Sequence, residues 1–425
     1  MTLSRFMTRT ISKYTLKKGI VKMTGLHDKK DVNRLILLFT LTYMVSYITR
    51  INYGTVILEM ERETKMARSL LSMALTGSFI TYGTGQVISG VLGDKFSPKK
   101  LISFGFIITI FMNLLIPLCY DPYQMLAVWC INGFAQSLMW PPLAKLMIFL
   151  LSDDDYKRAS VRVSWGSSFG TIFVYLVSPI LISTATWRSV FFLSAIIGVF
   201  MLLAWNKYAF DIEPQQKAVI PKESSNPTGA IFTPVMIFVM IAVVLQGMLR
   251  DGVTTWMPTY ISDTFDLGSA ISILTGVILP IFSILSFQVA SRIYRKTITN
   301  PVTCAGVIFA FGAASALSLY LFSDLSAVFS AILSALLTGA MHGVNFILVS
   351  MVPAFFKKYG NVSTVSGVIN SCTYIGSAAS TYGIALLSDL YGWRLTLLIW
   401  FVIAALGTLT CLLNAKPWKK LYHNQ

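Results

Sequence analysis

Charged side chains are scarce in this chain of 425 residues, and acidic ones are the scarcest. Asp, Glu, Lys and Arg together make up 12% of the sequence, whereas about a quarter is usual in soluble domains. Hydrophobic residues make up 55%, and the mean hydropathy is +0.68. This composition excludes an ordinary soluble domain and predicts a protein whose surface mostly faces lipid.

Cysteine and histidine are also few, with five and three copies. There is no CxxC spacing and no cluster of residues with the spacing of metal ligands. We therefore expect no metal and no cofactor, and the lack of a recognisable nucleophile–base pair argues against an enzyme. The cysteines lie in or at the ends of apolar segments, where we expect small buried hydrophobic residues and no disulfides. They are Cys119, Cys130, Cys304, Cys372 and Cys411.

Long apolar segments recur along the whole chain, and about 20 apolar residues suffice to cross a bilayer as a helix. We expect twelve such spans, which predicts an all-α membrane protein. Their ranges are 35–58, 70–92, 101–119, 125–150, 161–184, 189–207, 231–261, 268–291, 302–322, 325–353, 362–387 and 394–414.

A polar stretch at 208–229, rich in proline and serine, separates six spans from six and is typical of a linker. The expected organisation is a basic arm (1–34), two six-helix halves (35–207 and 230–415), this linker between them and a short tail (416–425).

Positive charge is unevenly distributed among the expected loops. If both termini lie in the cytoplasm, the inner segments hold 26 of the 34 Lys and Arg residues and the outer loops hold five. This bias follows the positive-inside rule, so we expect both termini in the cytoplasm and the protein in a bacterial plasma membrane. Topology and contact with anionic lipid then explain the net charge of +16. Nucleic acid is not expected as a partner.

Arg50 and Arg250 are cations inside helices that topology does not explain. Arg50 is the only charge from 35 to 58, and Arg250 and Asp251 are the only ones from 231 to 262. An arginine near the middle of a membrane helix costs roughly 2.5–3.5 kcal/mol on insertion scales. Guanidinium groups bind carboxylate and phosphate oxygens in a bidentate way and stay charged. Their matching places in the two halves predict a paired anion site where the halves meet, and hence a transporter of a negatively charged solute.

A structural role is the alternative for each cation inside a span. Arg50 precedes Glu59 by nine residues, so its long side chain could reach the membrane interface instead. Arg250 could be neutralised by Asp251, but adjacent residues point about 100° apart on a helix, so we do not expect a purely local pair. Lys145 is close to the end of its span, and we expect it to reach toward the cytoplasmic surface and not toward substrate.

The loop after the second span carries a recognisable motif. From Gly90 to Lys100 it reads Gly-Val-Leu-Gly-Asp-Lys-Phe-Ser-Pro-Lys-Lys, which resembles the G-x-x-x-D-R/K-x-x-x-R/K loop of the major facilitator superfamily. The resemblance implies two six-helix halves that rock about a central cavity. In such a turn Gly90 permits close helix contact. Asp94, followed by Lys95, can pair with a cationic group or a helix end and hold one gate state. A solvated basic loop is the alternative.

A narrower resemblance depends on three further motifs. The first span contains Arg50-Ile-Asn, the fourth contains Trp140-Pro-Pro, and the seventh contains Arg250-Asp-Gly followed by Trp256-Met-Pro-Thr-Tyr. Together they resemble the organophosphate:phosphate antiporter family, which carries glycerol phosphate, hexose phosphates and phosphoglycerates. This resemblance implies that Arg50 and Arg250 clamp the phosphate, one from each half.

The same resemblance places further side chains at the substrate site. Tyr43, Tyr47 and Tyr82 correspond to tyrosines near that site, and Tyr43 and Tyr47 share one helix face with Arg50. Interfacial aromatic residues are the alternative for these tyrosines. Gln86 stands where the glycerol-phosphate carriers have a lysine in the second helix. The anion clamp is thus kept while its polar surroundings are replaced.

A second group of residues is a candidate for ion coupling or for lining the cavity. His342 and Asn345 lie three apart on one face of the tenth span, and Asp251 brings a carboxylate next to Arg250. A buried histidine bonded to a carbonyl is the alternative. The Gly- and Ser-rich runs at 166–170 and 376–380 are expected to serve close helix packing and not substrate binding.

These observations together predict a monomeric twelve-helix transporter that works by alternating access within the lipid bilayer. We expect a small anionic substrate, a phosphorylated metabolite, exchanged for inorganic phosphate. Two alternatives stay open. One is a proton-coupled symporter of an organic carboxylate in the same fold. The other is a membrane sensor that binds a sugar phosphate and signals to a partner kinase.

Overall fold

The computed structural model describes residues 29–66, 68–210, 232–266, 278–323, 325–359 and 361–422. Most of the expected basic arm, most of the linker and the last three residues of the tail lie outside these ranges. Within them the regular secondary structure is helical and no strand occurs. The all-α expectation is confirmed for the described part of the chain.

The amino-terminal half contains six helical spans. They are α2 (Lys29–Thr64), α3 (Arg68–Lys95), α4 (Pro98–Leu115) with the short turn η1 (Ile116–Leu118), α5 (Pro122–Ser137) continued by α6 (Trp140–Leu150), α7 (Asp153–Thr184) and α8 (Trp187–Tyr208). The fourth span is interrupted between α5 and α6, directly before Pro141 and Pro142. Each proline lacks the backbone N–H that would bond to the preceding turn, and two in succession favour an interruption of the helix here.

The carboxy-terminal half repeats this plan. It comprises α9 (Pro234–Phe265), α11 (Ile278–Lys296), α12 (Pro301–Leu321), α13 (Ala327–Asn345) continued by η2 (Phe346–Met351) and η3 (Val352–Tyr359), and α14 (Val362–Tyr422). Two spans merge in α14 at Gly392, whose φ of 77° is left-handed and breaks the helical geometry. When α14 is counted as two spans and α13 with η2 and η3 as one, the described helices give six spans in each half, as the sequence predicted.

In the part of the chain that the structure describes, eight helical segments are long and apolar enough to cross a membrane, by length and composition alone. Among the other four expected spans, the fourth is interrupted and α11 is described only from Ile278. The remaining two, α3 and the first part of α14, are rich in Gly, Ser and Thr. They pack against each other across the two halves, so part of their surface meets protein instead of lipid.

Four helices begin with the same combination of a capping side chain and a proline. In each, the capping oxygen accepts a backbone N–H two or three residues ahead, a donor that the helix itself leaves unpaired. The proline in the next position has no backbone N–H of its own that would need a partner, and its φ is already helical. The pairs are Ser97 with Pro98, Asp121 with Pro122, Thr233 with Pro234, and Asn300 with Pro301. α4 and α12 are each the third span of their half, so the same capping arrangement occurs at equivalent positions in the two halves.

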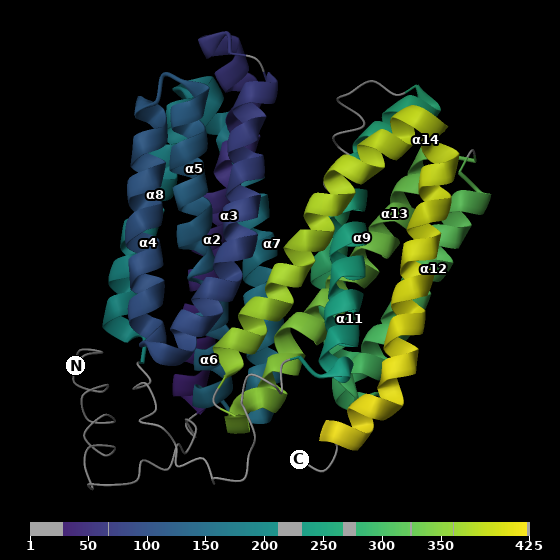
Figure 1. The fold of residues 1–425 in the computed structure, drawn as a ribbon. Helices are drawn as coiled ribbons and strands as arrows, with labels where there is room; N and C mark the ends of the chain where they lie inside the picture. Colours follow the sequence, from purple (N-terminus) through teal and green to yellow (C-terminus); the bar gives the residue numbers. More distant parts are fainter. Residues whose placement is uncertain are drawn as a thin grey trace, which may run out of the picture.

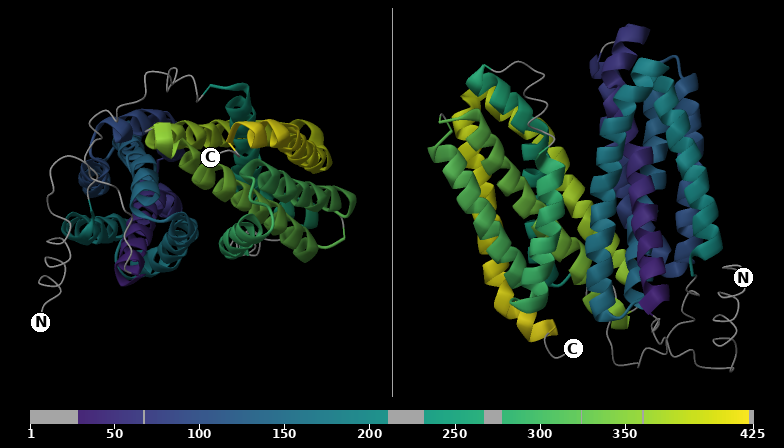
Figure 2. Two further views of the ribbon diagram at one scale, coloured as in Figure 1. Left: turned by 90° about the horizontal axis from the view of Figure 1, so that it is seen from below. Right: turned by 180° about the vertical axis from the view of Figure 1, so that it is seen from behind.

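The two halves stand side by side and diverge toward one end of the molecule (Figure 1). At the other end, where α2 begins and α14 ends, α6 of the first half contacts η3 and α14 of the second. We call this the closed end. The view from behind shows the same divergence (Figure 2). Between the halves, α3 packs on α14 and α7 packs on α11.

Glycine allows α3 and α14 to approach each other at this seam. A Cβ on Gly367 of α14 would lie 2.2 Å from the carbonyl oxygen of Gln86 in α3, and a Cβ on Gly90 would lie 2.8 Å from that of Ser363. Neither position can accept a side chain unless the backbones move apart. Gly90 therefore makes the close helix contact that the loop motif predicted.

Packing inside each half also depends on glycine. A Cβ on Gly166 of α7 would lie 2.5 Å from the carbonyl oxygen of Thr40 in α2, and one on Gly376 of α14 would lie 2.0 Å from that of Val244 in α9. The expectation that these runs serve close packing is confirmed. All five cysteines are free and four are buried, also as expected.

Candidate substrate site between the two halves

Arg50 lies in α2 between two tyrosine rings. Its guanidinium carbon is 4.2 Å from the ring centroid of Tyr47 and 4.6 Å from that of Tyr82 in α3. Arg50 thus folds over the preceding turn of its own helix, away from Glu59, and does not extend toward the interface. Cation–π contacts strengthen away from water, and a guanidinium has five N–H donors in its plane that can bind an oxygen ligand.

The aromatic side chains around Arg50 continue into the second half. Tyr82, only 2% exposed, packs edge to face on Tyr374 of α14 with 4.7 Å between the ring centroids. On the other side, Tyr43 lies 5.2 Å from Tyr47 and 5.1 Å from Trp140 of α6, again between centroids. These contacts fix the ring planes, so side chains of α2, α3, α6 and α14 together set the orientation of Arg50.

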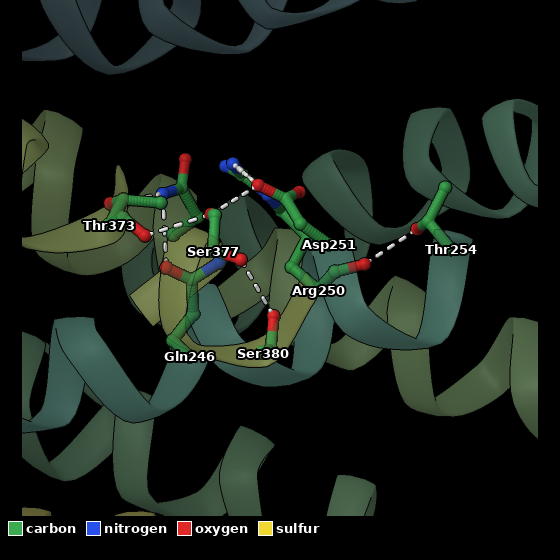
Figure 3. Close-up of polar contacts among 8 residues, drawn as sticks. Gln246, Arg250, Asp251, Thr254, Thr373, Ser377 and Ser380 are labelled. Atoms are coloured by element: carbon green, nitrogen blue, oxygen red, sulfur yellow. Dashed lines mark hydrogen bonds and ion pairs between the residues drawn. The ribbon is translucent and has the colours of Figure 1, made fainter. Parts of the chain in front are cut away.

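Arg250 of α9 binds its own neighbour. Its Nε and one terminal nitrogen donate to the two carboxylate oxygens of Asp251 at 2.6 and 2.8 Å (Figure 3). The two side chains are only 14% and 33% exposed. Our expectation that this pair would not form locally is wrong. The arginine side chain is long enough to curl back over Asp251, and with little water nearby each charge gains more from its partner.

Polar side chains of α14 and α13 surround this ion pair. The hydroxyl of Ser377 in α14 donates to Oδ2 of Asp251 (Figure 3). His342 of α13 interacts electrostatically with both Asp251 and Arg250, and its ring packs edge to face on Phe287 at 5.7 Å. The carboxylate therefore faces groups from three helices.

Asn345, one turn beyond His342, belongs to a hydrogen-bond network that ties the same helices together. Its amide donates to the side-chain oxygen of Gln246 in α9 at 3.2 Å and approaches the hydroxyl of Thr373 in α14 at 3.4 Å. Asn345 thus positions α13 against α9 and α14 beside the ion pair. Its contact with substrate stays a prediction.

Arg50 and Arg250 are linked through one face of α14 although they belong to different halves. Tyr374 packs on Tyr82, which contacts Arg50, and Ser377, three residues further along α14, donates to Asp251, the partner of Arg250. The fold therefore brings the two predicted arginines and their tyrosines to one region at the seam. Such a region can offer guanidinium donors to an anion from two sides, which is the geometry that a clamp requires.

Gln86 is fully buried in α3, and its side-chain oxygen accepts a hydrogen bond from Asn370 of α14 at 3.0 Å. Its amide nitrogen lies 3.5 Å from the carbonyl oxygen of Ser137. Gln86 thus joins the two halves one turn away from Tyr82. Whether it also touches substrate stays a prediction.

Asp94, near the end of α3, binds the first turn of α14. Its two carboxylate oxygens accept the backbone N–H groups of Ser363 at 3.0 Å and Thr364 at 2.7 Å. These are donors that a helix start leaves unpaired, at the positive end of the helix dipole. The Nζ of Lys145 in α6 lies 3.4 Å from the same carboxylate. We call Asp94, Lys145, Ser363 and Thr364 the latch.

The latch contains both partners that the loop motif predicted for Asp94, a cationic group and a helix end. Lys145 reaches toward the closed end, where it also donates to the carbonyl of Gly93 at 2.9 Å. Lys95, the last residue of α3, is exposed. The part that Gly90, Asp94 and Lys95 play in gating stays a prediction.

Two more contacts join the halves through α7. The hydroxyl of Tyr156 donates to the carbonyl oxygen of Ser350 in η2. The hydroxyls of Ser168 and Ser283 in α11 are 3.1 Å apart, and both residues are buried. The halves thus meet through α3 with α14 and through α7 with α11, an arrangement with approximate twofold character.

The family model of the Major Facilitator Superfamily matches residues 39–381, which cover most of both halves and include the latch. The chain belongs to the Major Facilitator Superfamily. It is therefore an integral multi-pass membrane transporter and not an enzyme.

Known relatives within the superfamily include carriers of phosphorylated compounds. A probable hexose phosphate transport protein of Chlamydia muridarum (strain MoPn / Nigg) is 27% identical over 37% of this chain and 35% of its own length. The chloroplastic ascorbate transporter of Arabidopsis thaliana is 22% identical over 63% of this chain and 53% of its own length. The matches thus cover about a third to a half of these two proteins. The membrane sensor protein UhpC of Escherichia coli (strain K12) is 21% identical over 90% of this chain and 92% of its length.

Solved structures of the superfamily share the fold over nearly the whole chain. The proton:xylose symporter XylE matches with a TM-score of 0.73 at 12% identity, over 90% of this chain and 95% of its own. FucP in its outward conformation matches with a TM-score of 0.72 at 11% identity, over 91% and 99%. The predicted fold class is confirmed.

Sequence reasoning missed Tyr374 and Ser377 of α14. Both lie on the face of the helix that meets Tyr82 and Asp251, together with Asn370, which meets Gln86. The signal that could have found them was the recurrence of polar residues at helical spacing, four and three apart, in an otherwise apolar span. We expected the run at 376–380 to serve helix packing alone. This holds for Gly376, whereas Ser377 also donates a hydrogen bond to Asp251.

Proposed function

We propose that this protein is a secondary transporter of a small organic anion of the phosphate-ester class, which it exchanges for inorganic phosphate by alternating access. One observation carries the proposal: Arg50 and Arg250 come from opposite halves and meet the same face of α14, Arg50 through Tyr82 and Tyr374 and Arg250 through Asp251 and Ser377. An anion held by both would bind each half, so it would be coupled to the movement of one half against the other.

The relatives support the chemistry of the substrate. Three of them are a probable hexose phosphate transport protein, the sensor UhpC and the glycerol-3-phosphate transporter of Bacillus subtilis (strain 168). Guanidinium groups suit the oxygens of a phosphate because they donate in a planar, bidentate way and stay charged. Phosphate esters and inorganic phosphate share these oxygens, so one clamp serves both partners of an exchange.

The distribution of charge supports an orientation. The start of α2 and the end of α14 lie at the closed end (Figure 1), and the basic loops predict that this end faces the cytoplasm. The arrangement described would then be open to the outside, with the latch closing the inner side. We propose a monomer in a bacterial plasma membrane with both termini in the cytoplasm.

Exchange can be tested in liposomes that contain the purified protein. Phosphate loaded inside should accelerate the uptake of external labelled phosphate or a phosphate ester, because a site that holds an anion closes more readily than one with uncompensated arginine charge. Equal uptake into loaded and phosphate-free vesicles would contradict the exchange mode.

A proton-coupled symporter of an organic carboxylate is the second candidate function. The bidentate contact between Arg250 and Asp251 favours it, because it shows that a carboxylate fits this guanidinium. A thermal-shift screen with phosphate esters, sugars and carboxylates distinguishes the two substrate classes. A sensor is a third candidate, favoured by the match with UhpC over 90% of this chain. A sensor would bind ligand without measurable flux.

A further inference from the structure

Asp251 occupies one of the two bidentate edges that Arg250 can offer to an anionic substrate. Its two carboxylate oxygens take the Nε–H and a terminal N–H at 2.6 and 2.8 Å, which is one complete bidentate edge of the guanidinium. A phosphate or carboxylate that binds this edge in the same way must displace Asp251. The substrate and the side chain therefore compete for the same donors.

The net charge of the site determines whether the binding of an anion also requires a proton. Arg50, Arg250 and Asp251 carry a formal charge of +1 together when all three are ionised. Among the residues that the structure describes, His342 of α13, Tyr374 of α14 and Tyr47 of α2 are further titratable groups near this ion pair. A monovalent anion brings the three charged groups to neutrality. A divalent anion would leave an excess negative charge unless one proton is also bound.

We propose that Asp251 is an internal counter-anion and the proton site of this carrier. It binds Arg250 whenever no transported anion does, and it releases the guanidinium when an anion enters. If the entering anion is divalent, an oxygen of the released carboxylate takes a proton from the water phase and returns it when the anion leaves. Ser377 stays beside Asp251 in both states because its hydroxyl can donate to the carboxylate and accept from the acid.

The inference gives the carrier two modes. In the exchange of one anion for another, the carrier changes conformation in both directions with an anion bound and Asp251 displaced. Net uptake requires the carrier to return without an anion, and this return is possible because Asp251 then neutralises Arg250. It follows that Asp251 should matter more for net uptake than for exchange. The inference rests on the proposed anion clamp.

The test compares the two modes with labelled inorganic phosphate in proteoliposomes. Exchange is measured with phosphate on both sides, and net uptake is measured into phosphate-free vesicles. In Asp251→Asn the amide cannot neutralise Arg250, so the ratio of net uptake to exchange should fall at least tenfold. Asp251→Glu keeps a carboxylate and should stay within threefold of the wild-type ratio. Asp266→Asn, at the exposed end of the same helix α9, is the matched control.

Proton uptake is measured separately on the wild-type protein. At alkaline pH, where phosphate is divalent, net uptake should remove one proton per phosphate from the external medium. An unchanged ratio in Asp251→Asn, or net uptake without protons in the wild type, would overturn the inference. A wild-type protein that moves phosphate in neither mode would instead refute the proposed function. The proton measurement decides the matter even if Asp251→Asn does not fold.

Discussion

At the scale of single residues, the two arginines of the site differ in what holds them. Arg50 lies over the uncharged ring faces of Tyr47 and Tyr82, whereas Arg250 has a carboxylate partner. Arg50 therefore keeps its full positive charge for a ligand, and Arg250 shares its charge with Asp251. The first contact of an entering anion should be with Arg50.

Replacement by lysine tests whether the guanidinium geometry matters. Arg50→Lys and Arg250→Lys keep the charge but lose the planar fork, so an anion loses a charge-assisted hydrogen bond worth about 1.5–3 kcal/mol. Uptake should fall by roughly one to two orders of magnitude in each variant. Flux in liposomes checks this, with thermal melting to show that each variant is folded. Near-normal flux in both would mean that the arginines are structural.

At the scale of helices, the seam between α3 and α14 depends on the absence of a side chain at Gly367. In Gly367→Ala the new Cβ would meet the backbone of α3, which cannot rotate away, so we expect a cost of about 1–3 kcal/mol to the closed end. The melting temperature and the transport rate should both change.

Gly383 supplies the matched control in the same helix. No atom lies within 4 Å of a Cβ built there, and alanine is a better helix former than glycine by about 1 kcal/mol. Gly383→Ala should therefore leave stability unchanged or raise it. If both alanine variants behave alike, the close contact at Gly367 is not what holds α14 against α3.

At the scale of the whole molecule, alternating access requires the halves to separate where they now touch. The hydroxyls of Ser168 and Ser283, 3.1 Å apart, mark such a place between α7 and α11. In Ser168→Cys/Ser283→Cys an oxidant should form a disulfide across the halves. Transport should then stop and return after reduction.

Two controls accompany this experiment. Each single cysteine variant, treated in the same way, should keep its transport rate, as should the oxidised wild-type protein with its five free cysteines. Full transport by the cross-linked double variant would show that the halves do not separate between α7 and α11 during turnover.

The sequence predicted the parts of this molecule that follow from local patterns. The spans follow from runs of apolar residues, and the packing at Gly166 and Gly376 follows from runs of small residues. Asp94 was expected to find a cation or a helix end, and it finds both, Lys145 and the start of α14. Each of these depends on a residue type and its place in a helix.

Contacts between distant helices were harder to predict. Tyr374 joins the tyrosines around Arg50 only because α14 packs on α3, and one sequence does not show which faces of two remote helices meet. The pair of Arg250 with Asp251 was misjudged for another reason. Helix geometry gives the direction of the Cβ atoms, but a long side chain in a place with little water bends toward the nearest opposite charge.

The latch has a consequence for how this protein tolerates mutation. Its receiving side consists of the backbone N–H groups of Ser363 and Thr364, which every amino acid except proline supplies. A saturation scan should therefore show tolerance of many residue types at Thr364, which is partly exposed, and of small residues at Ser363, which is fully buried, with proline as the shared exception. Because proline is accepted in the first turn of a helix, its effect would report the lost hydrogen bond and not a broken α14. Genetic variation would thus reveal Asp94 and Lys145 more readily than the backbone donors of Ser363 and Thr364.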